Sequence, residues 1–498
     1  MNVNPITRLD YPDLDVIRVE DTYYMVSTTM HFMPGCEILQ SFDLVHWEHV
    51  TYVYETLDHT DAQQLKSGQN IYGQGMWAAS LRYHEGRFCI CFVANDTRKT
   101  YLYTSEKIDG PWKKQLIEGF YHDGSLLFDE DGRNYIVYGN DEIWITELNE
   151  DLTAPKKDGL HRLLVSDHKN PELGYEGSHI QKINGYYYIF LIHSLRDRWM
   201  RTEACFYSDS LEGEFTGGDV LCDDRGYCGQ GVAQGGIVDT PDGRWYAMLF
   251  QDSGAVGRIP ILVPVTWKDH FPVFGQSGHV PEEIEVHSTR PGYIYQPLVG
   301  SDDFCNGLLP RWQFNHDPDP RYYHLDALQG TYTITTREVC TELTQAVNTL
   351  TQRMSYPSCA AEVTVDASAL KEGDVAGLCA LQSCYAAVGI TKHHGKYEVL
   401  MLDKKEDGIL DMTEGTVVES HQMDFRLEAD FCNMKDEARC YYRVNKGDWL
   451  PIGTVHKLYF KLDHFTGCRF GLFCYAAEET GGSACFRDFK YYDVDEIS

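Results

Sequence analysis

The chain repeats one short segment five times, and this repetition constrains its fold more than any other feature of the sequence. Each copy is an apolar run rich in β-branched or aliphatic residues, then a turn, then an aromatic-rich run. Apolar runs joined by residues that accept tight-turn backbone angles are typical of β-hairpins. The copies span residues 16–27, 81–94, 126–139, 180–192 and 237–250. Their starts lie 65, 45, 54 and 57 residues apart, a spacing that indicates the blades of a β-propeller.

The five copies also share a position just before the first strand of each hairpin. When the copies are aligned on the aromatic residue near the start of the second strand, this position lies 11 or 12 residues upstream. Because propeller blades are arranged radially, equivalent positions face one another across the central channel. The residues at this position are Asp13, Trp77, Asp123, Glu176 and Gln234. The alignment therefore predicts three carboxyl groups and an indole around one mouth of the channel.

Carboxyl groups at one channel mouth suggest hydrolysis of a glycosidic bond, which uses one carboxyl as acid and another as base. A third can tune or orient the acid, because crowded like charges raise a carboxyl pKa. Trp77 offers an apolar face on which a sugar ring can stack. Two other interpretations stay open. Asp13 and Asp123 can be turn residues and Glu176 a solvated charge, or the three carboxylates can hold calcium.

The five-fold repeat ends before a stretch rich in proline and charged residues, and a different strand pattern follows it. Residues 1–285 carry the five copies, residues 286–300 are the predicted linker, and residues 301–498 form the predicted second domain. The second domain has short alternating strands punctuated by Gly, Asp and Asn, which is typical of a β-sandwich. Its clearest predicted strands are 331–335, 359–365, 385–390, 397–402, 439–444 and 470–474. The expected fold is all-β, a five-bladed β-propeller followed by a β-sandwich.

Composition disfavours several classes of partner. The chain has 43 basic and 75 acidic residues and a formal charge of −32, whereas nucleic acids and anionic membranes need a positive face. No apolar run reaches the roughly 18 residues of a membrane-spanning helix. The 16 cysteines lack zinc-type spacing, and several lie in apolar strands, so buried free thiols in a reducing cytoplasm are expected. The first residues lack the pattern of a secretion signal, which also favours a cytoplasmic location.

Several motifs resemble those of glycoside hydrolase family 43, whose members are five-bladed propeller enzymes acting on xylosides and arabinosides. The second domain is similar to the concanavalin-like β-sandwich of its β-xylosidase-like members, most clearly at residues 373–382. The resembling motifs of the propeller lie at residues 11–13, 30–35, 75–78, 122–125, 176–179 and 257–258.

The resemblance implies a role for each of the three carboxyl groups. Asp13 would be the general base that activates water, Asp123 would modulate the pKa of the acid, and Glu176 would be the general acid. Family members invert the anomeric configuration, a mechanism that places acid and base roughly 6.5–9.5 Å apart with a water between them.

The resemblance also implies the residues that bind the substrate. Phe32 and Trp77 would form the apolar walls of the first sugar pocket, and Arg258 would donate hydrogen bonds to sugar hydroxyls. Many members have a channel histidine that holds a metal ion, often calcium, or water. Gln234 stands at that position, and glutamine is a poorer centre for metal coordination. No cofactor is therefore expected to be required, a structural calcium is disfavoured, and no metal ligand is assigned.

The sequence thus predicts an inverting exo-glycoside hydrolase that releases terminal β-D-xylose or α-L-arabinofuranose, or both, from short oligosaccharides. Its partner would be that small xylo- or arabino-oligosaccharide, with no nucleic acid and no membrane, and a homo-oligomer stays open. A non-catalytic carbohydrate-binding propeller and an endo-arabinanase are the alternatives. Xylose and arabinose are not distinguished, because the two sugars present similar hydroxyl patterns to one pocket.

Overall fold

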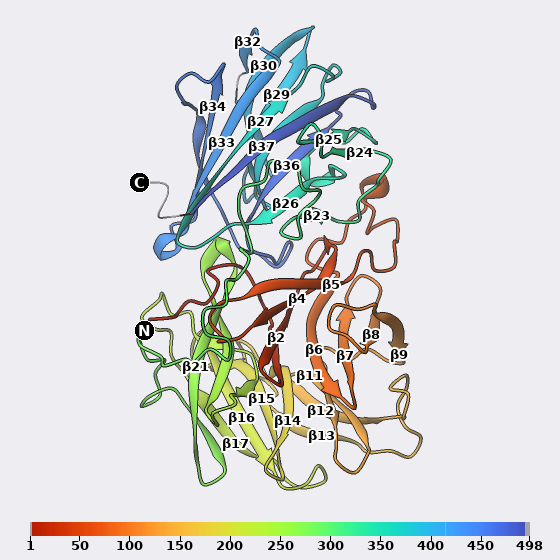
Figure 1. Ribbon diagram of the computed structural model, residues 1–498, viewed down its shortest axis with the longest axis vertical. Coiled ribbons are helices and arrows are strands. Elements are labelled where there is room, and N and C mark those ends of the chain that lie inside the picture. The colour runs from red at the N-terminus through yellow and green to blue at the C-terminus, as the bar shows by residue number, and fades with distance from the viewer. Residues whose placement is uncertain (1, 414, 494–498) are drawn as a thin grey trace.

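The computed structural model describes residues 2–413 and 415–493, and these residues form two parts built from antiparallel sheets (Figure 1). The five sheets of the first part surround a channel, and the two larger sheets of the second part belong to a sandwich. This arrangement confirms the all-β expectation of a five-bladed propeller followed by a β-sandwich. The described helices are single 3₁₀ turns without the length and apolar character of a membrane span: η1 (Lys66–Gly68), η2 (Gly254–Val256), η3 (Leu343–Gln345) and η4 (Cys432–Met434).

Each propeller blade is an antiparallel sheet whose first strand lies at the channel. Blade 1 contains β1 (Asp15–Val19), β2 (Thr22–Ser27), β4 (Gly35–Ser41) and β5 (Glu48–Tyr54). Blade 2 contains β6 (Met76–His84), β7 (Arg87–Ala94), β8 (Lys99–Ser105) and β9 (Lys113–Ile117). Blade 3 contains β10 (Ser125–Phe128), β11 (Asn134–Asn140), β12 (Glu142–Leu148) and β13 (His161–Ser166).

Blades 4 and 5 complete the ring. Blade 4 contains β14 (Glu176–Ile183), β15 (Tyr186–Ser194), β16 (Arg201–Ser208) and β17 (Thr216–Leu221). Blade 5 contains β18 (Val232–Ala233), β19 (Ile237–Asp239), β20 (Trp245–Asp252), β21 (Arg258–Lys268) and β22 (Phe271–Phe274). Here β18 and β19 both pair with β20 and share the innermost position.

The five predicted hairpins are the inner strand pairs of the blades. In blade 4, Ile183 pairs with Tyr186 across a two-residue turn, and both turn residues, Asn184 and Gly185, have positive φ. A type I′ turn requires that geometry, which glycine adopts freely and asparagine tolerates. The aliphatic and aromatic side chains of these strands pack between neighbouring blades, so alternating hydrophobicity sets the blade spacing.

The ring closes through contacts between the first and last blades. The Asn4 side chain exchanges two hydrogen bonds of 2.8 Å with the backbone of Leu262 in β21. Arg18 in β1 forms an ion pair of 2.5 Å with Asp239 in β19. Both contacts join segments more than 200 residues apart in the sequence, so they hold the propeller closed.

The β-sandwich consists of two sheets packed face to face over a core of buried aliphatic and aromatic side chains. All six strands predicted for this domain are confirmed. One sheet contains β3 (Phe32–Met33), β23 (Gln313–Asn315), β26 (Leu350–Arg353), β28 (Val375–Leu381), β29 (Ala386–His393), β30 (Lys396–Lys404), β31 (Leu410–Met412), β32 (Thr416–Val418) and β36 (Arg469–Tyr475). The other contains β24 (Tyr323–Asp326), β25 (Thr331–Thr335), β27 (Ser358–Asp366), β33 (Gln422–Asp430), β34 (Glu437–Val444), β35 (Leu450–Lys457) and β37 (Ser483–Asp493).

The two parts of the chain are joined by more than the connecting segment. Residues 275–312, all of them described, form no strand. The connecting segment follows blade 1, where Thr289 donates from its backbone to Phe42 and from its hydroxyl to Asp21. Strand β3, from the first part of the chain, pairs with β23 and extends a sheet of the sandwich. The cysteines of the described chain are free, as expected, and Cys89, Cys91 and Cys474 are buried.

A buried arginine of the sandwich anchors the propeller. The guanidinium of Arg353 lies 2.8 Å from the Glu37 carboxylate, donates to the Asp10 carbonyl and covers the Tyr11 ring at 4.1 Å. Burial opposes the Glu37 charge, but Arg353 and His49 outweigh it and lower the pKa of Glu37 to about 2. The pair is therefore charged at neutral pH in a site that excludes water.

Replacement of Arg353 by methionine is expected to destabilise the chain by about 3–5 kcal/mol, because it leaves the Glu37 charge buried without its partner. Urea unfolding measures this loss. A double variant in which Glu37 is also methionine is expected to recover most of it, since apolar replacement of a whole buried pair is often neutral. Equal stability of the single and double variants would show that the ion pair is not the cause.

Three histidines cluster between the propeller and the sandwich. The His31 ring lies 4.8 Å from the His316 ring and 5.0 Å from the His464 ring, measured between centroids. Burial lowers the pKa of all three, to about 3 for His464, and nearby positive groups add to the effect. The folded state therefore holds these imidazoles in their neutral form.

This cluster is expected to make the protein sensitive to acid. The folded pKa values lie below the unfolded value of about 6.5, so the stabilisation exists above that pH and is lost as pH falls below it. Replacement of His464 by glutamine is expected to lower the pH slope of the unfolding free energy between pH 6 and 5 by about 1.4 kcal/mol per unit. Urea unfolding across that range measures the slope, and an unchanged slope would contradict this account.

Candidate active site

The predicted ring of residues gathers at one end of the propeller channel, where the inner strands begin. The cavity there has a volume of about 240 Å³. All five residues of the ring line it, together with side chains from other parts of the chain. The cavity is lined by Asp13, Trp77, His122, Asp123, Asn140, Glu176, Arg201, Gln234, Arg258, Leu462 and Phe465.

Local backbone geometry at the blade entries places these side chains at the channel. Asp13, Asp123 and Gln234 all have left-handed φ values, of 50°, 47° and 61°. Non-glycine residues rarely adopt this conformation, and aspartate is among those that tolerate it. Blades 2 and 4 instead carry a β-bulge at the start of β6 and of β14, which places Trp77 and Glu176 at the same level.

Asp13 is held from both sides. Arg258 donates from Nη1 to Oδ1 at 2.7 Å, and the Thr28 hydroxyl donates to Oδ2 at 2.8 Å. Asp13 is only 7% exposed, so these contacts lie in a site with little competing water. The carboxylate has a fixed orientation, and each oxygen retains one lone pair for another hydrogen bond.

Arg258, predicted to bind sugar hydroxyls, makes its strongest contact with Asp13. Its guanidinium also lies 4.5 Å from the centre of the Phe465 ring. The Nε and Nη2 groups are buried and have no hydrogen-bond partner in the described chain. Buried donors without a partner are costly, so they favour a ligand that brings oxygen acceptors.

Glu176 is oriented by residues that flank the start of β14. Asn140, the last residue of β11, donates to its Oε2 at 2.8 Å, and His122 Nε2 lies 3.8 Å from the same oxygen. No hydrogen bond to Oε1 occurs within the described residues. One carboxyl oxygen is therefore positioned by the protein, and the other is available to a ligand.

Buried Asp123 and half-buried His122 form an ion pair of 3.5 Å beside Glu176. Burial raises the pKa of Asp123, with His122 opposing and the Glu176 and Asp13 carboxyl groups adding to the rise. The Asp123 carboxylate in turn raises the pKa of His122 against burial. Asp123 Oδ2 accepts a hydrogen bond of 2.9 Å from the Gly177 backbone. Burial and the crowding of like charges therefore hold the pKa of Asp123 above its ordinary value.

The same cluster gathers side chains of the types that bind metal ions. His122, Asp123 and Glu176 offer ligand atoms that lie within 4.8 Å of one another. Calcium takes six to eight oxygen ligands, whereas this set supplies one imidazole and two carboxylates that already accept hydrogen bonds. This set therefore supplies fewer oxygen ligands than a calcium ion takes.

Phe32 does not form a wall of this pocket. It is fully buried, and Asn315 of β23 pairs with it, so its ring packs within the sandwich part of the interface. The Arg469 guanidinium lies 3.5 Å from the centre of the ring. Strand pairing with a distant segment therefore places Phe32 in the interface and not among the residues that line the cavity.

The apolar walls come partly from the sandwich instead. Leu462 and Phe465, in the segment between β35 and β36, line the cavity, and the Phe465 and Trp77 rings are 5.5 Å apart. No local pattern identified these two residues or Arg201, which begins β16. His122 is adjacent to the predicted acidic residue Asp123 in the sequence, and this adjacency could have identified it as a pocket residue. Asn140 resembled an ordinary turn residue in the sequence.

The arrangement has the parts needed for acid–base chemistry on a sugar. Three carboxyl groups with different contacts surround a small cavity, and Trp77 supplies an aromatic wall. The buried nitrogen donors of Arg258 and Trp77 can bind hydroxyl groups. Two carboxyls in distinct environments are what hydrolysis of a glycosidic bond requires.

Family models match both parts of the chain. The model for "Glycosyl hydrolases family 43" matches residues 3–272. The model for "Beta xylosidase C-terminal Concanavalin A-like domain" matches residues 301–492. A β-xylosidase of Formosa agariphila is 26% identical over 99% of this chain and 89% of that protein. A non-reducing end α-L-arabinofuranosidase of Bacteroides ovatus is 23% identical over 82% of this chain and 79% of that protein.

Solved structures show the same two-part architecture. A bifunctional GH43-CE protein of Bacteroides eggerthii is 42% identical, with a TM-score of 0.92 over 98% of this chain. This chain spans 63% of the length of that protein. An engineered GH43 glycoside hydrolase, described as displaying endo-xylanase and exo-arabinofuranosidase activity, is 27% identical, with a TM-score of 0.86 over 99% of both chains.

Proposed function

The chain belongs to glycosyl hydrolase family 43, and on that premise we propose that it is an inverting exo-glycosidase. It would remove terminal β-D-xylose or α-L-arabinofuranose from short xylo- or arabino-oligosaccharides. The observation that carries the proposal is the 240 Å³ pocket with Asp13, Asp123 and Glu176 around it. Clefts for drug-sized ligands measure about 300–1,000 Å³. The smaller volume favours one terminal sugar ring over an internal chain segment.

Glu176 is the proposed general acid. Asn140 occupies Oε2, so the proton would reside on Oε1 and pass from there to the oxygen that joins the terminal sugar to its leaving group. Asp123 and His122 lie beside Glu176 and would orient it and modulate its proton affinity. Phe465 supplies an apolar wall of the same pocket, against Trp77 and Arg258.

Asp13 is the proposed general base. Arg258 and Thr28 each occupy one lone pair of the carboxylate, and the remaining lone pairs can accept a proton from an attacking water. The free donors of Arg258 and the Trp77 indole N–H would bind sugar hydroxyls in the same pocket. The proposed mechanism uses two carboxyl groups and water, and it needs no cofactor.

The test combines substrate choice with product stereochemistry. We expect hydrolysis of nitrophenyl β-D-xyloside or nitrophenyl α-L-arabinofuranoside, and the ratio of the two rates names the preferred sugar. Proton NMR in the first minutes should show α-xylose as the initial product from a β-xyloside, before mutarotation. Reduced xylotetraose should lose single xylose units from its non-reducing end.

Three outcomes would contradict the proposal. Initial release of the β-anomer would mean retention, which requires a nucleophile instead of a water-activating base. Internal fragments from the reduced tetraose would mean endo action. Failure to hydrolyse both nitrophenyl substrates and short oligosaccharides would exclude the proposed substrate class.

A further inference from the structure

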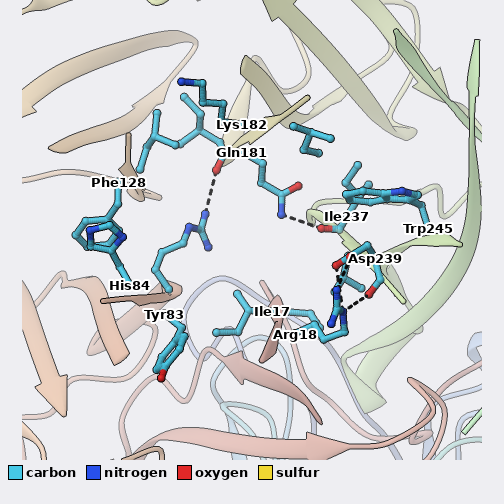
Figure 2. Close-up of a pocket in the computed structure, with 16 residues that line it drawn as sticks. Ile17, Arg18, Tyr83, His84, Phe128, Gln181, Lys182, Ile237, Asp239 and Trp245 are labelled. Carbon is cyan, nitrogen blue, oxygen red and sulfur yellow. Dashed lines mark hydrogen bonds and ion pairs between the residues drawn. The ribbon is translucent and has the colours of Figure 1, made fainter. Parts of the chain in front are cut away.

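A second and larger cavity lies at the other end of the propeller channel. Its volume is about 420 Å³, and its walls come from the inner strands of all five blades, β1, β6, β10, β14 and β19 (Figure 2). On β6, Trp77 lines the active site and His84 lines this cavity. The two residues are seven steps apart along the strand, or about 23 Å at a rise of about 3.3 Å per residue. The two cavities are therefore at opposite mouths of one channel.

The Arg82 side chain spans the channel between them. The Arg82 guanidinium donates to the carbonyls of Leu126 and Ile180 at 2.8 and 3.2 Å, and to the Ser125 hydroxyl at 2.7 Å. It also donates to Asp15 at 2.6 Å, so it connects the inner strands of four blades. A ligand in the second cavity would not reach the carboxyl groups of the active site.

Aromatic side chains stand around the second cavity. His84 stacks on Phe128 at 4.6 Å with an angle of 8° between the rings, and Trp245 lies on another side (Figure 2). Tyr83 is 45% exposed at the rim, where its ring packs beside Phe88 at 4.6 Å. Flat amphipathic rings of this kind can stack against the apolar face of a sugar.

Polar groups in the cavity carry little net charge. Arg18 is paired with Asp239, Arg82 with Asp15, and Lys182 with Asp129. An anionic ligand would find each of these cations already neutralised, and the chain as a whole carries a formal charge of −32. Paired charges still present donors and acceptors, which suit a neutral ligand with many hydroxyl groups.

One further polar atom in this region lacks a partner. Gln181 donates from Nε2 to the Ile237 carbonyl at 2.8 Å, while its Oε1 is buried without a hydrogen bond in the described chain. A buried acceptor without a donor is costly, and a sugar hydroxyl is a donor. Pockets that bind small molecules commonly combine a mainly apolar wall with a few such polar groups.

We propose that this cavity is a non-catalytic carbohydrate-binding site that holds a neutral pentose-containing polysaccharide or oligosaccharide. The inference takes its sugar class from the proposed function. The site would keep the enzyme on a polymer or on a long oligosaccharide while the opposite mouth removes terminal units from neighbouring chains. Binding there is independent of catalysis, because Arg82 separates the two cavities.

The test is native gel electrophoresis of the full chain in gels that contain soluble arabinoxylan, arabinan or anionic polygalacturonate. The Asp13→Asn background prevents digestion of the gel, and excess xylose and arabinose occupy the catalytic pocket. We expect a neutral polymer to slow migration and polygalacturonate to have no effect. Tyr83→Ala, and independently Trp245→Ala, should raise the apparent Kd at least tenfold. Tyr83→Phe, which keeps the ring, should bind like its parent.

Matched measurements separate this inference from the proposed function. Leu116→Ala removes a side chain of similar exposure from the outer strand of the same blade and should leave binding unchanged. In the catalytically competent chain, Tyr83→Ala should retain kcat/KM on a nitrophenyl glycoside within twofold. Two results would overturn this inference and leave the proposed function intact. One is an active enzyme whose migration no neutral polymer slows. The other is slowed migration that persists in both Tyr83→Ala and Trp245→Ala. A third result would have the opposite meaning. If the polymer slows the parent but not these variants, and the catalytically competent chain hydrolyses neither sugar substrate, the binding site is supported and the proposed function is contradicted.

Discussion

Replacement of Asp13 by asparagine is expected to slow hydrolysis by about 10²–10⁴-fold on every substrate, whatever its leaving group. Asparagine has nearly the same shape but cannot take a proton from water. Arg258 and Thr28 hold both oxygens of Asp13, so the variant tests proton transfer more than position. The measurement is kcat/KM for a nitrophenyl glycoside and for the corresponding disaccharide.

The control for Asp13 is Thr28→Val, which keeps the carboxylate and removes one of the two hydrogen bonds that orient it. A hydrogen bond to a charged group is worth about 1.5–3 kcal/mol, so this variant should lose about 10–10²-fold in kcat/KM, at or below the lower end of the loss expected for Asp13→Asn. If Asp13→Asn retains activity within tenfold of the wild type, Asp13 does not activate the water. Loss of activity with a changed circular dichroism spectrum would instead indicate a folding defect.

Replacement of Glu176 by glutamine is expected to give a different pattern, because only poor leaving groups need protonation. Hydrolysis of the disaccharide should fall by about 10²–10⁴-fold. A dinitrophenyl glycoside, whose leaving group departs without a proton, should be hydrolysed at a rate close to that of the wild type. The glutamine can still accept the hydrogen bond from Asn140, so the shape of the site is kept.

The control for Glu176 is Glu172→Gln, the same chemical change on an exposed residue of the preceding loop. That variant should behave like the wild type on all substrates. Equal losses of Glu176→Gln on the disaccharide and the dinitrophenyl glycoside would contradict the acid assignment. The two catalytic variants together assign the roles, because loss of the base is independent of the leaving group and loss of the acid is not.

The site depends on both parts of the chain. The sandwich supplies Leu462 and Phe465 to the pocket, and His464 lies in the cluster of neutral histidines between propeller and sandwich. Acid that charges this cluster would weaken the contacts that hold Phe465 over Arg258. The stability of the chain and the geometry of the pocket are therefore coupled at this interface. The Arg353 and His464 variants are expected to change both.

The sequence alone was sufficient for the strands and for the ring of carboxyl groups. Strand alternation and turn chemistry are local, so the hairpin closed by Asn184 and Gly185 could be predicted from its own residues. Five repeats of that hairpin imply radial symmetry, and symmetry places Asp13, Asp123 and Glu176 together without any long-range information. The repeat thus supplied the spatial relationship between distant residues that usually has to come from tertiary contacts.

The tertiary structure decided which other side chains complete the pocket. Phe32 was expected to form a wall of the first sugar pocket, but pairing of β3 with β23 buries it in the interface. Phe465 comes from a segment more than 300 residues away from Trp77, and its own sequence carries no repeat that relates it to the propeller. Such contacts depend on how two separately patterned domains pack, and packing is set by shape and burial across the whole surface, which local periodicity does not encode.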